Sequence, residues 1–243
     1  MTAEADIAAI DNGGVNTAAE VRTALTSLLT PANIRALAAV SSAHGDDDEF
    51  DDDTKTGITE TTPTGTATWT EANGVLSVKF DTQSSTDIAV ALKALTPNTA
   101  PVTIETAVRL LTAQTANPMV GVCFTDGTGA TANVAATILG MTATDPFLSA
   151  AYGVINNLTA PASYSALFGV ESLLYMRIVW TAANTFEIVL SPDGVSWTKF
   201  GVSDISKTMT PTHFGCVVSA WSQTFESVAS FQYLRVTETD LSV

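Results

Sequence analysis

The residues most suggestive of chemistry are the seven carboxylates that occupy residues 46–53, Asp-Asp-Asp-Glu-Phe-Asp-Asp-Asp. Hard cations such as Ca²⁺ bind clusters of carboxylate and carbonyl oxygens, so Asp51, Asp52 and Asp53 are candidate metal ligands. The block lacks the regular spacing and the glycine of an EF-hand loop, and so dense a run of like charge usually stays extended and solvated. The sequence therefore predicts an acidic linker here, with a calcium site as the alternative.

Catalytic motifs are absent from the rest of the sequence. Retaining glycoside hydrolases use two carboxylates on one face, but neither Glu105 nor Glu187 has a second acid two residues away along its strand. The sequence contains no Gly-x-Ser-x-Gly motif, and no histidine accompanies a candidate nucleophile. The glycines at 127 and 129 lack the other residues of a phosphate-binding loop. We therefore predict that the protein is not an enzyme.

Two cysteines, Cys123 and Cys216, lie within apolar stretches that are typical of strands. No Cys-x-x-Cys spacing and no neighbouring histidine supports a metal site or a disulfide pair. We predict that both are reduced and serve as small core residues.

Aromatic side chains are the candidate binding groups, because flat rings stack on sugars. Trp221 follows an apolar run and precedes Ser-Gln-Thr, which predicts an exposed position at a strand end. Residues 141–168 read as a long loop, and loops of that length are often functional, so Tyr152 and Tyr164 join Trp221 as candidate glycan contacts. The other tryptophans lie in strand-like stretches and are expected to pack in the core or against a sheet: Trp69, Trp180 and Trp197.

The elements that would position these residues are short strands. From residue 65 onward, apolar and polar residues alternate in runs separated by turn residues, as in 75–80 after Asn73-Gly74. The turn at residues 191–194, Ser-Pro-Asp-Gly, separates two further runs. We expect about ten or eleven strands with no helix between them, which is typical of an antiparallel β-sandwich or barrel.

The first 45 residues follow a different pattern. Thr17 and Glu20 have the spacing of a capping box, and apolar residues then recur at helical spacing. Two short helices cannot bury this stripe by themselves, so we expect it to dock on a partner or on copies of this chain, in a closed homo-oligomer. The stripe consists of Val21, Leu25, Leu28, Leu29, Ile34 and Leu37. The predicted organisation is therefore a helical docking segment at 1–45, an acidic linker to about 53, and a β-sandwich at 54–243.

Charge and composition limit the partners. Only 14% of the residues are charged, and the formal net charge is −15. Nucleic acid and anionic membrane surfaces both require clustered Lys and Arg, so neither is expected as a partner. No apolar run is long enough to span a bilayer, and residues 1–10 do not resemble a signal peptide. We therefore expect the protein to be synthesised in the cytoplasm without a secretion signal.

Three stretches carry a resemblance to a known fold family. They are residues 49–52 with 66–69 and 74–78, the hairpin 191–198 (Ser-Pro-Asp-Gly-Val-Ser-Trp-Thr), and the closing run 229–236. The first resembles the opening strands, the second the S-x-DG-x-x-W hairpin, and the third the last core strand of the concanavalin-like, laminin-G-like jelly-roll superfamily. The resemblance covers about residues 48–240 and implies an antiparallel jelly roll, but it says little about function.

Residues 10–25 carry a second resemblance. Their sequence, Ile-Asp-Asn-Gly-Gly-Val-Asn-Thr-Ala-Ala-Glu-Val-Arg-Thr-Ala-Leu, is similar to a segment that recurs in virion proteins of tailed bacteriophages, in fibres, spikes and decoration proteins. This resemblance implies a structural virion protein that displays a lectin-like jelly roll adhesive to host-surface glycans, made in the host cytoplasm and carried on the particle. Its partners would be other virion proteins and copies of itself. The alternative is a stand-alone carbohydrate-binding module or lectin.

Overall fold

The computed structural model describes residues 44, 46–81, 87–96, 98–111, 118–141, 146–165, 173–181, 185–200, 205–206, 208–220 and 226–241. Every regular element in these ranges is a β-strand. No helix among them is long and apolar enough to cross a membrane. The predicted N-terminal helices with their apolar stripe, and Trp221, lie outside the described residues.

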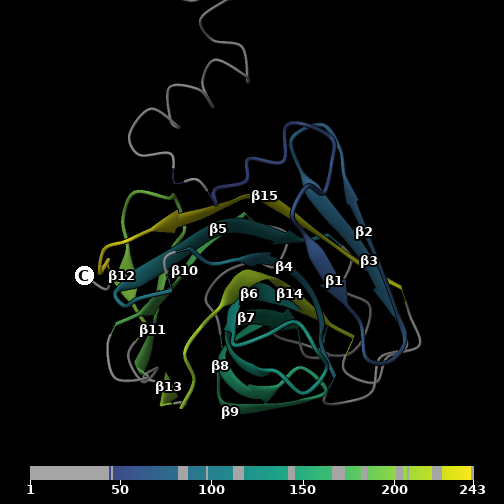
Figure 1. The fold of residues 1–243 in the computed structure, drawn as a ribbon. Helices are drawn as coiled ribbons and strands as arrows, with labels where there is room; N and C mark the ends of the chain where they lie inside the picture. Colours follow the sequence, from purple (N-terminus) through teal and green to yellow (C-terminus); the bar gives the residue numbers. More distant parts are fainter. Residues whose placement is uncertain are drawn as a thin grey trace, which may run out of the picture. The chain divides into compact units, whose positions relative to one another are not determined.

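The strands form two antiparallel sheets (Figure 1). The seven-stranded sheet has the order β1-β4-β14-β6-β7-β8-β9, and the larger sheet has the order β12-β11-β10-β5-β15-β3-β2, with β13 paired to β11. The strand bounds are β1 Thr59–Thr61, β2 Thr66–Glu71, β3 Leu76–Asp81, β4 Ala89–Ala94, β5 Val102–Leu110, β6 Met119–Thr125, β7 Asn133–Met141, β8 Pro146–Val154, β9 Asn157–Ser165, β10 Leu174–Trp180, β11 Thr185–Ser191, β12 Thr198–Lys199, β13 Ile205–Ser206, β14 His213–Ser219 and β15 Ser227–Thr237.

The main core fills the space between the sheets. Its members come from alternate positions of the strands, such as Leu76, Val78 and Phe80 on β3, as period-2 patterning requires. The prediction of an all-β, antiparallel jelly-roll sandwich is confirmed for the described residues.

The β2–β3 hairpin forms where the sequence predicted it. Asn73 and Gly74 both have positive φ, 57° and 73°, and the backbones of Ala72 and Val75 exchange hydrogen bonds of 3.0 and 3.2 Å. A two-residue turn with positive φ at both positions matches the right-handed twist of the strands, which is why Asn-Gly is preferred there.

The predicted long loop at residues 141–168 is wrong. Most of it is the hairpin of β8 and β9, and β8 pairs with β7 from Met141↔Pro146 to Asn133↔Val154. The two strands are rich in Ala, Ser and Gly and include two prolines, so their intrinsic β-propensity is low. Pairing with the neighbouring strand, which local patterning does not reveal, stabilises them.

A second apolar cluster lies on the other face of the seven-stranded sheet. Val90 and Leu92 belong to it, whereas the alternating Ala89 and Ala91 face the main core. The N–H of Ile88, next to β4, donates to the carbonyl of Ile155 at the β8–β9 turn over 3.0 Å, although three strands separate β4 from β8 in the sheet. The sheet therefore curls until distant strands meet, and side chains fill the face inside the curl.

Candidate functional site

The acidic block is largely integrated into the sandwich. We call His44 and residues 46–53 the clasp. Asp48 and Leu234 of β15 exchange backbone hydrogen bonds of 2.8 and 2.7 Å, and the Phe50 side chain is 0% exposed in the main core. The prediction of a solvated linker is therefore wrong for residues 46–50. The linker prediction was based on the run of like charges. It did not consider that the phenylalanine inside the block can be buried while the acids around it stay near the surface.

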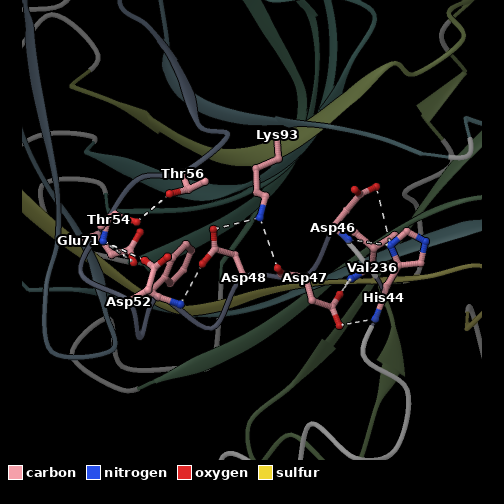
Figure 2. A network of polar contacts seen from close by, with 11 residues as sticks. His44, Asp46, Asp47, Asp48, Asp52, Thr54, Thr56, Glu71, Lys93 and Val236 are labelled. Atoms are coloured by element: carbon pink, nitrogen blue, oxygen red, sulfur yellow. Dashed lines mark hydrogen bonds and ion pairs between the residues drawn. The ribbon is translucent and has the colours of Figure 1, made fainter.

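Two acids of the clasp, Glu49 and Asp48, pair with cations from different sheets. The Arg235 guanidinium of β15 donates to both Glu49 oxygens, over 2.6 and 3.0 Å. The Lys93 ammonium of β4 lies 3.1 Å from Asp48 Oδ2 and also donates to the Asp47 carbonyl (Figure 2). A bidentate Arg–carboxylate pair is strong and directional. Because β15 and β4 belong to different sheets, these contacts link the two sheets through the clasp.

Backbone N–H groups hold the first acids of the clasp. Asp47 accepts hydrogen bonds from Val236 N–H at 2.7 Å and from His44 N–H at 2.9 Å (Figure 2). Asp46 accepts one from Thr96 N–H at 2.8 Å. Burial raises the pKa of Asp47 above its ordinary value, and these N–H groups offset part of that effect. Asp46 and Asp47 therefore serve as hydrogen-bond acceptors for backbone N–H groups near the clasp.

The three predicted metal ligands do not converge on one point. Asp51, Asp52 and Asp53 are all exposed, and Asp53 accepts the N–H of Asn73 at 2.7 Å, as part of the β2–β3 turn. Among the described residues, no three Asp, Glu, His or Cys side chains form a group that could hold a metal ion. The three-aspartate calcium site is therefore not supported.

Asp52 instead meets a carboxyl group that sequence reasoning missed. Glu71, at the end of β2, is 6% exposed, and Thr54 N–H donates to Asp52 Oδ1 at 2.9 Å and to Glu71 Oε1 at 3.2 Å. Burial, followed by the hydrogen bond to Asp52, raises the pKa of Glu71 to about 7. The same hydrogen bond from Glu71 lowers the pKa of Asp52. The pKa values of the two neighbouring carboxyl groups therefore shift in opposite directions.

The sequence did contain a signal for Glu71. It follows Trp69 by two residues in β2, so both side chains lie on the same face, and Trp69 is buried. An acid on the core face of a strand is unusual and indicates a special partner.

A row of charged side chains crosses the outer face of the larger sheet. Arg177 of β10, Glu105 of β5 and Arg235 of β15 lie directly opposite one another in the strand register. Arg177 Nε donates to Glu105 Oε2 over 2.8 Å, and Arg235 continues the row to Glu49. Opposite charges in adjacent strands stabilise one another across the sheet.

Two aromatic rings extend this row. The guanidinium carbon of Arg177 lies 3.5 Å from the ring centroid of Trp197, and Tyr233 donates its hydroxyl to Glu105 Oε1 over 2.6 Å. Trp197 is partly exposed, and it sits in the turn region where Val195 is 81% exposed. We call Trp197, Arg177, Glu105, Tyr233, Arg235 and Glu49 the outer row. It combines the partly exposed ring of Trp197 with fixed hydrogen-bonding groups, while the Tyr233 ring is largely buried.

The aromatic residues singled out from the sequence have different environments. Tyr152 is partly buried and packs against the main core. Tyr164 lies in β9, and its side chain is outside the described residues, as is Trp221. Trp69 and Trp180 are buried in the core, and Trp197 packs against Arg177 on the outer face of the larger sheet, so all three agree with the prediction of packing in the core or against a sheet.

Both cysteines are buried and free, as predicted. They lie on adjacent strands, β6 and β14, with Cys123 in the second cluster and Cys216 in the main core. Their side chains therefore occupy opposite faces of the sheet.

Comparison with known proteins supports the fold. No protein-family model and no curated protein matches the chain. It is similar in structure to the GH43 protein BlXynB from Bacillus licheniformis, with a TM-score of 0.60 and 14% identity over 82% of this chain and 40% of that chain. It is also similar to a xylan beta-1,4-xylosidase from Bacillus halodurans C-125, with a TM-score of 0.51 and 15% identity over 81% of this chain and 40% of that one.

A third similar structure is a functionally unknown protein from Saccharomyces cerevisiae, with a TM-score of 0.52 and 11% identity over 76% of this chain and 98% of that chain. At such identities the likeness shows a shared β-sandwich fold and does not transfer function. The chain spans about 40% of the length of the two Bacillus proteins. These structures thus support the jelly-roll sandwich fold, while the superfamily membership and the bacteriophage resemblance of residues 10–25 stay predictions.

Proposed function

We propose that this chain is a non-catalytic, carbohydrate-binding β-sandwich that serves as a structural component of a tailed-bacteriophage particle. The observation that carries the binding function is the outer row, in which Trp197 is stacked on Arg177 beside a fixed ladder of charged groups. The observation that motivates the virion role is the resemblance of residues 10–25 to phage fibre, spike and decoration proteins.

The chemistry of the outer row suits a sugar. A sugar ring presents C–H groups that pack on an aromatic face and hydroxyl groups that both donate and accept hydrogen bonds. Trp197 supplies the ring, while guanidinium and carboxylate groups beside it supply donors and acceptors. Because ion pairs already fix these side chains, binding would cost little side-chain ordering.

The same contacts favour a binding role over hydrolysis. Glu105 accepts from Arg177 and Tyr233, and Glu187 is 2.8 Å from the Lys199 ammonium. Each carboxylate is therefore occupied by a partner from the sandwich itself. Neither is paired with a second acid in the way that acid–base hydrolysis of a glycosidic bond requires.

A glycan array tests the binding function. The full chain should bind a defined class of glycans. Trp197→Ala should weaken the affinity at least about tenfold, since an aromatic residue that the bound ligand covers contributes that much or more. Trp197→Phe should retain most binding because it keeps a ring. Val195→Ala, in the same exposed turn region, is the matched control and should bind as the natural chain does.

Two results would reject the binding proposal. One is that the folded chain binds no glycan. The other is that Trp197→Ala binds as tightly as the natural chain.

Light scattering after size exclusion tests the assembly role. We expect residues 1–43, with their apolar stripe, to hold copies of the chain together in a closed oligomer. The matched truncation begins at His44, because His44 and residues 46–50 contact the sandwich. A full-length oligomer and a monomeric truncation would support the proposal. Two monomers would reject self-assembly through this segment and favour the alternative, a stand-alone carbohydrate-binding module.

A further inference from the structure

We propose that the larger sheet carries a second glycan-contact site, so that the protein holds an extended, uncharged polysaccharide along the outer face of this sheet. The inference rests on the glycan binding proposed above, and it adds both a second site and the class of the ligand. The second site, which we call the polar pocket, lies on β2 and β3 beside the start of β15. It is lined by Thr66, Thr68, Lys79, Phe80, Asp81 and Glu226.

The strand pattern places the polar pocket on the outer face. Val78 of β3 is buried in the main core, so the neighbouring Lys79 side chain points away from the core. On β2, the exposed Thr68 lies directly opposite Lys79, and the exposed Thr66 lies opposite Asp81. The polar pocket and the outer row are therefore on the same face of the same sheet.

The size and the lining of the polar pocket suit one sugar unit. Its volume is about 230 Å³, below the roughly 300–1,000 Å³ of sites for drug-sized ligands. Sugar hydroxyl groups donate and accept hydrogen bonds, and the lining offers both kinds of partner. The threonine hydroxyls donate and accept, the Lys79 ammonium donates, and the carboxylates of Asp81 and Glu226 accept.

The charge of the polar pocket selects against acidic sugars. The Lys79 ammonium lies 2.9 Å from Glu226 Oε2, and Thr66 donates its hydroxyl to Asp81. Because one cation faces two acids, the pocket has no excess positive charge for a carboxylate or sulfate group. The formal net charge of −15 for the whole chain adds a repulsion at longer range. An uncharged sugar is therefore the class of ligand that this surface favours.

Strand β15 connects the polar pocket to the outer row (Figure 1). Glu226 immediately precedes β15 and Arg235 lies near its end, so at about 3.3 Å per residue they are about 30 Å apart. Between them, Ser230 lies directly opposite Ser77 of β3 and Arg109 of β5. These three residues alternate with core residues of their strands, so polar side chains continue along the outer face from one site to the other.

A polysaccharide that reaches both sites should bind more tightly than one that reaches a single site. After the first contact forms, the second forms within the same complex, at a high effective concentration. We therefore expect fragments longer than about 30 Å to bind at least about tenfold more tightly than shorter fragments of the same polysaccharide.

Isothermal titration calorimetry on the full chain tests this length dependence. The probes are dextran, mannan, galactan and xylan, each as fragments shorter and longer than about 30 Å. Carboxymethyl-dextran of matched length tests the charge preference, and it should bind more weakly than dextran does.

Lys79→Ala tests the polar pocket itself. It should lower the affinity for long fragments about tenfold, to the level of short fragments, and leave short-fragment binding at the outer row unchanged. The Lys79 side chain is 58% exposed, so the variant should fold, with a urea midpoint close to that of the natural chain. Thr70→Ala is the matched control, because Thr70 is exposed on the same face of β2 but does not line the pocket.

The outcomes separate this inference from the binding function on which it rests. Equal affinities for short and long fragments would overturn the second site, and so would unchanged long-fragment binding in Lys79→Ala. In either case a loss of binding in Trp197→Ala would leave the outer row as a glycan site. Tighter binding of carboxymethyl-dextran than of dextran would overturn the uncharged class. Binding of no fragment at all would overturn both proposals.

Discussion

Replacement of Phe50 by alanine would measure how strongly the clasp is anchored in the sandwich. The Phe50 side chain is 0% exposed and belongs to the main core, although carboxylates flank it on both sides in sequence. Truncation of a buried phenylalanine to alanine costs about 3–5 kcal/mol, from lost transfer free energy and the cavity that is left. A domain of ordinary stability has about 5–15 kcal/mol in total, so Phe50→Ala should fold but be much less stable.

Urea unfolding, followed by circular dichroism, measures the loss in the free energy of unfolding. With an m-value of about 2–3 kcal/mol/M, the midpoint should fall by about 1–2.5 M. Phe50→Leu keeps most of the apolar volume and should lose less than about 1.5 kcal/mol. Asp51→Ala, at the neighbouring exposed residue, should change stability by no more than about 0.5 kcal/mol. A midpoint for Phe50→Ala within error of the natural chain would show that the clasp contributes nothing to the core.

Three further outcomes follow from single contacts. Burial lowers the pKa of His213, so the folded state binds a proton at this imidazole more weakly than the unfolded chain does. The contribution of His213 to the free energy of unfolding should therefore be complete above the ordinary histidine pKa and decrease as the pH falls below it. The urea midpoints at pH 7.5 and pH 5.5 should differ less in His213→Gln than in the natural chain. Burial raises the pKa of the Cys123 and Cys216 thiols, so both should be inert to a thiol reagent in the native state and react fully in urea. Arg235→Lys loses the bidentate pair with Glu49 and should cost about 1 kcal/mol in urea unfolding; an unchanged midpoint would contradict the importance of that geometry.

The outer row and the clasp show why parts of the candidate sites could not be foreseen. Arg177, Glu105 and Arg235 become neighbours only because β10, β5 and β15 adopt one particular register. Nothing in the local pattern around Glu105 indicates a partner at residue 177 or 235. The Asp52–Glu71 pair likewise depends on the clasp folding back onto β2.

Local sequence patterns were sufficient to predict the structure wherever a short stretch of chain determines its own conformation. The Asn73-Gly74 turn, the alternation in β3 and the burial of Trp69 and Trp180 all follow from steric preferences and from period-2 patterning. The same patterning gave the all-β class and the absence of regular helices among the described residues.

The sequence by itself therefore determined the class of fold, the β2–β3 hairpin and the burial of both cysteines and of Trp69 and Trp180, since these depend on neighbours along the chain. Only the tertiary structure decided that β8 and β9 are strands, that Phe50 is buried within an acidic block, and that Glu71 faces Asp52. In each case a partner distant in sequence outweighs the local preference, because cross-strand hydrogen bonds and apolar burial stabilise more than propensity opposes.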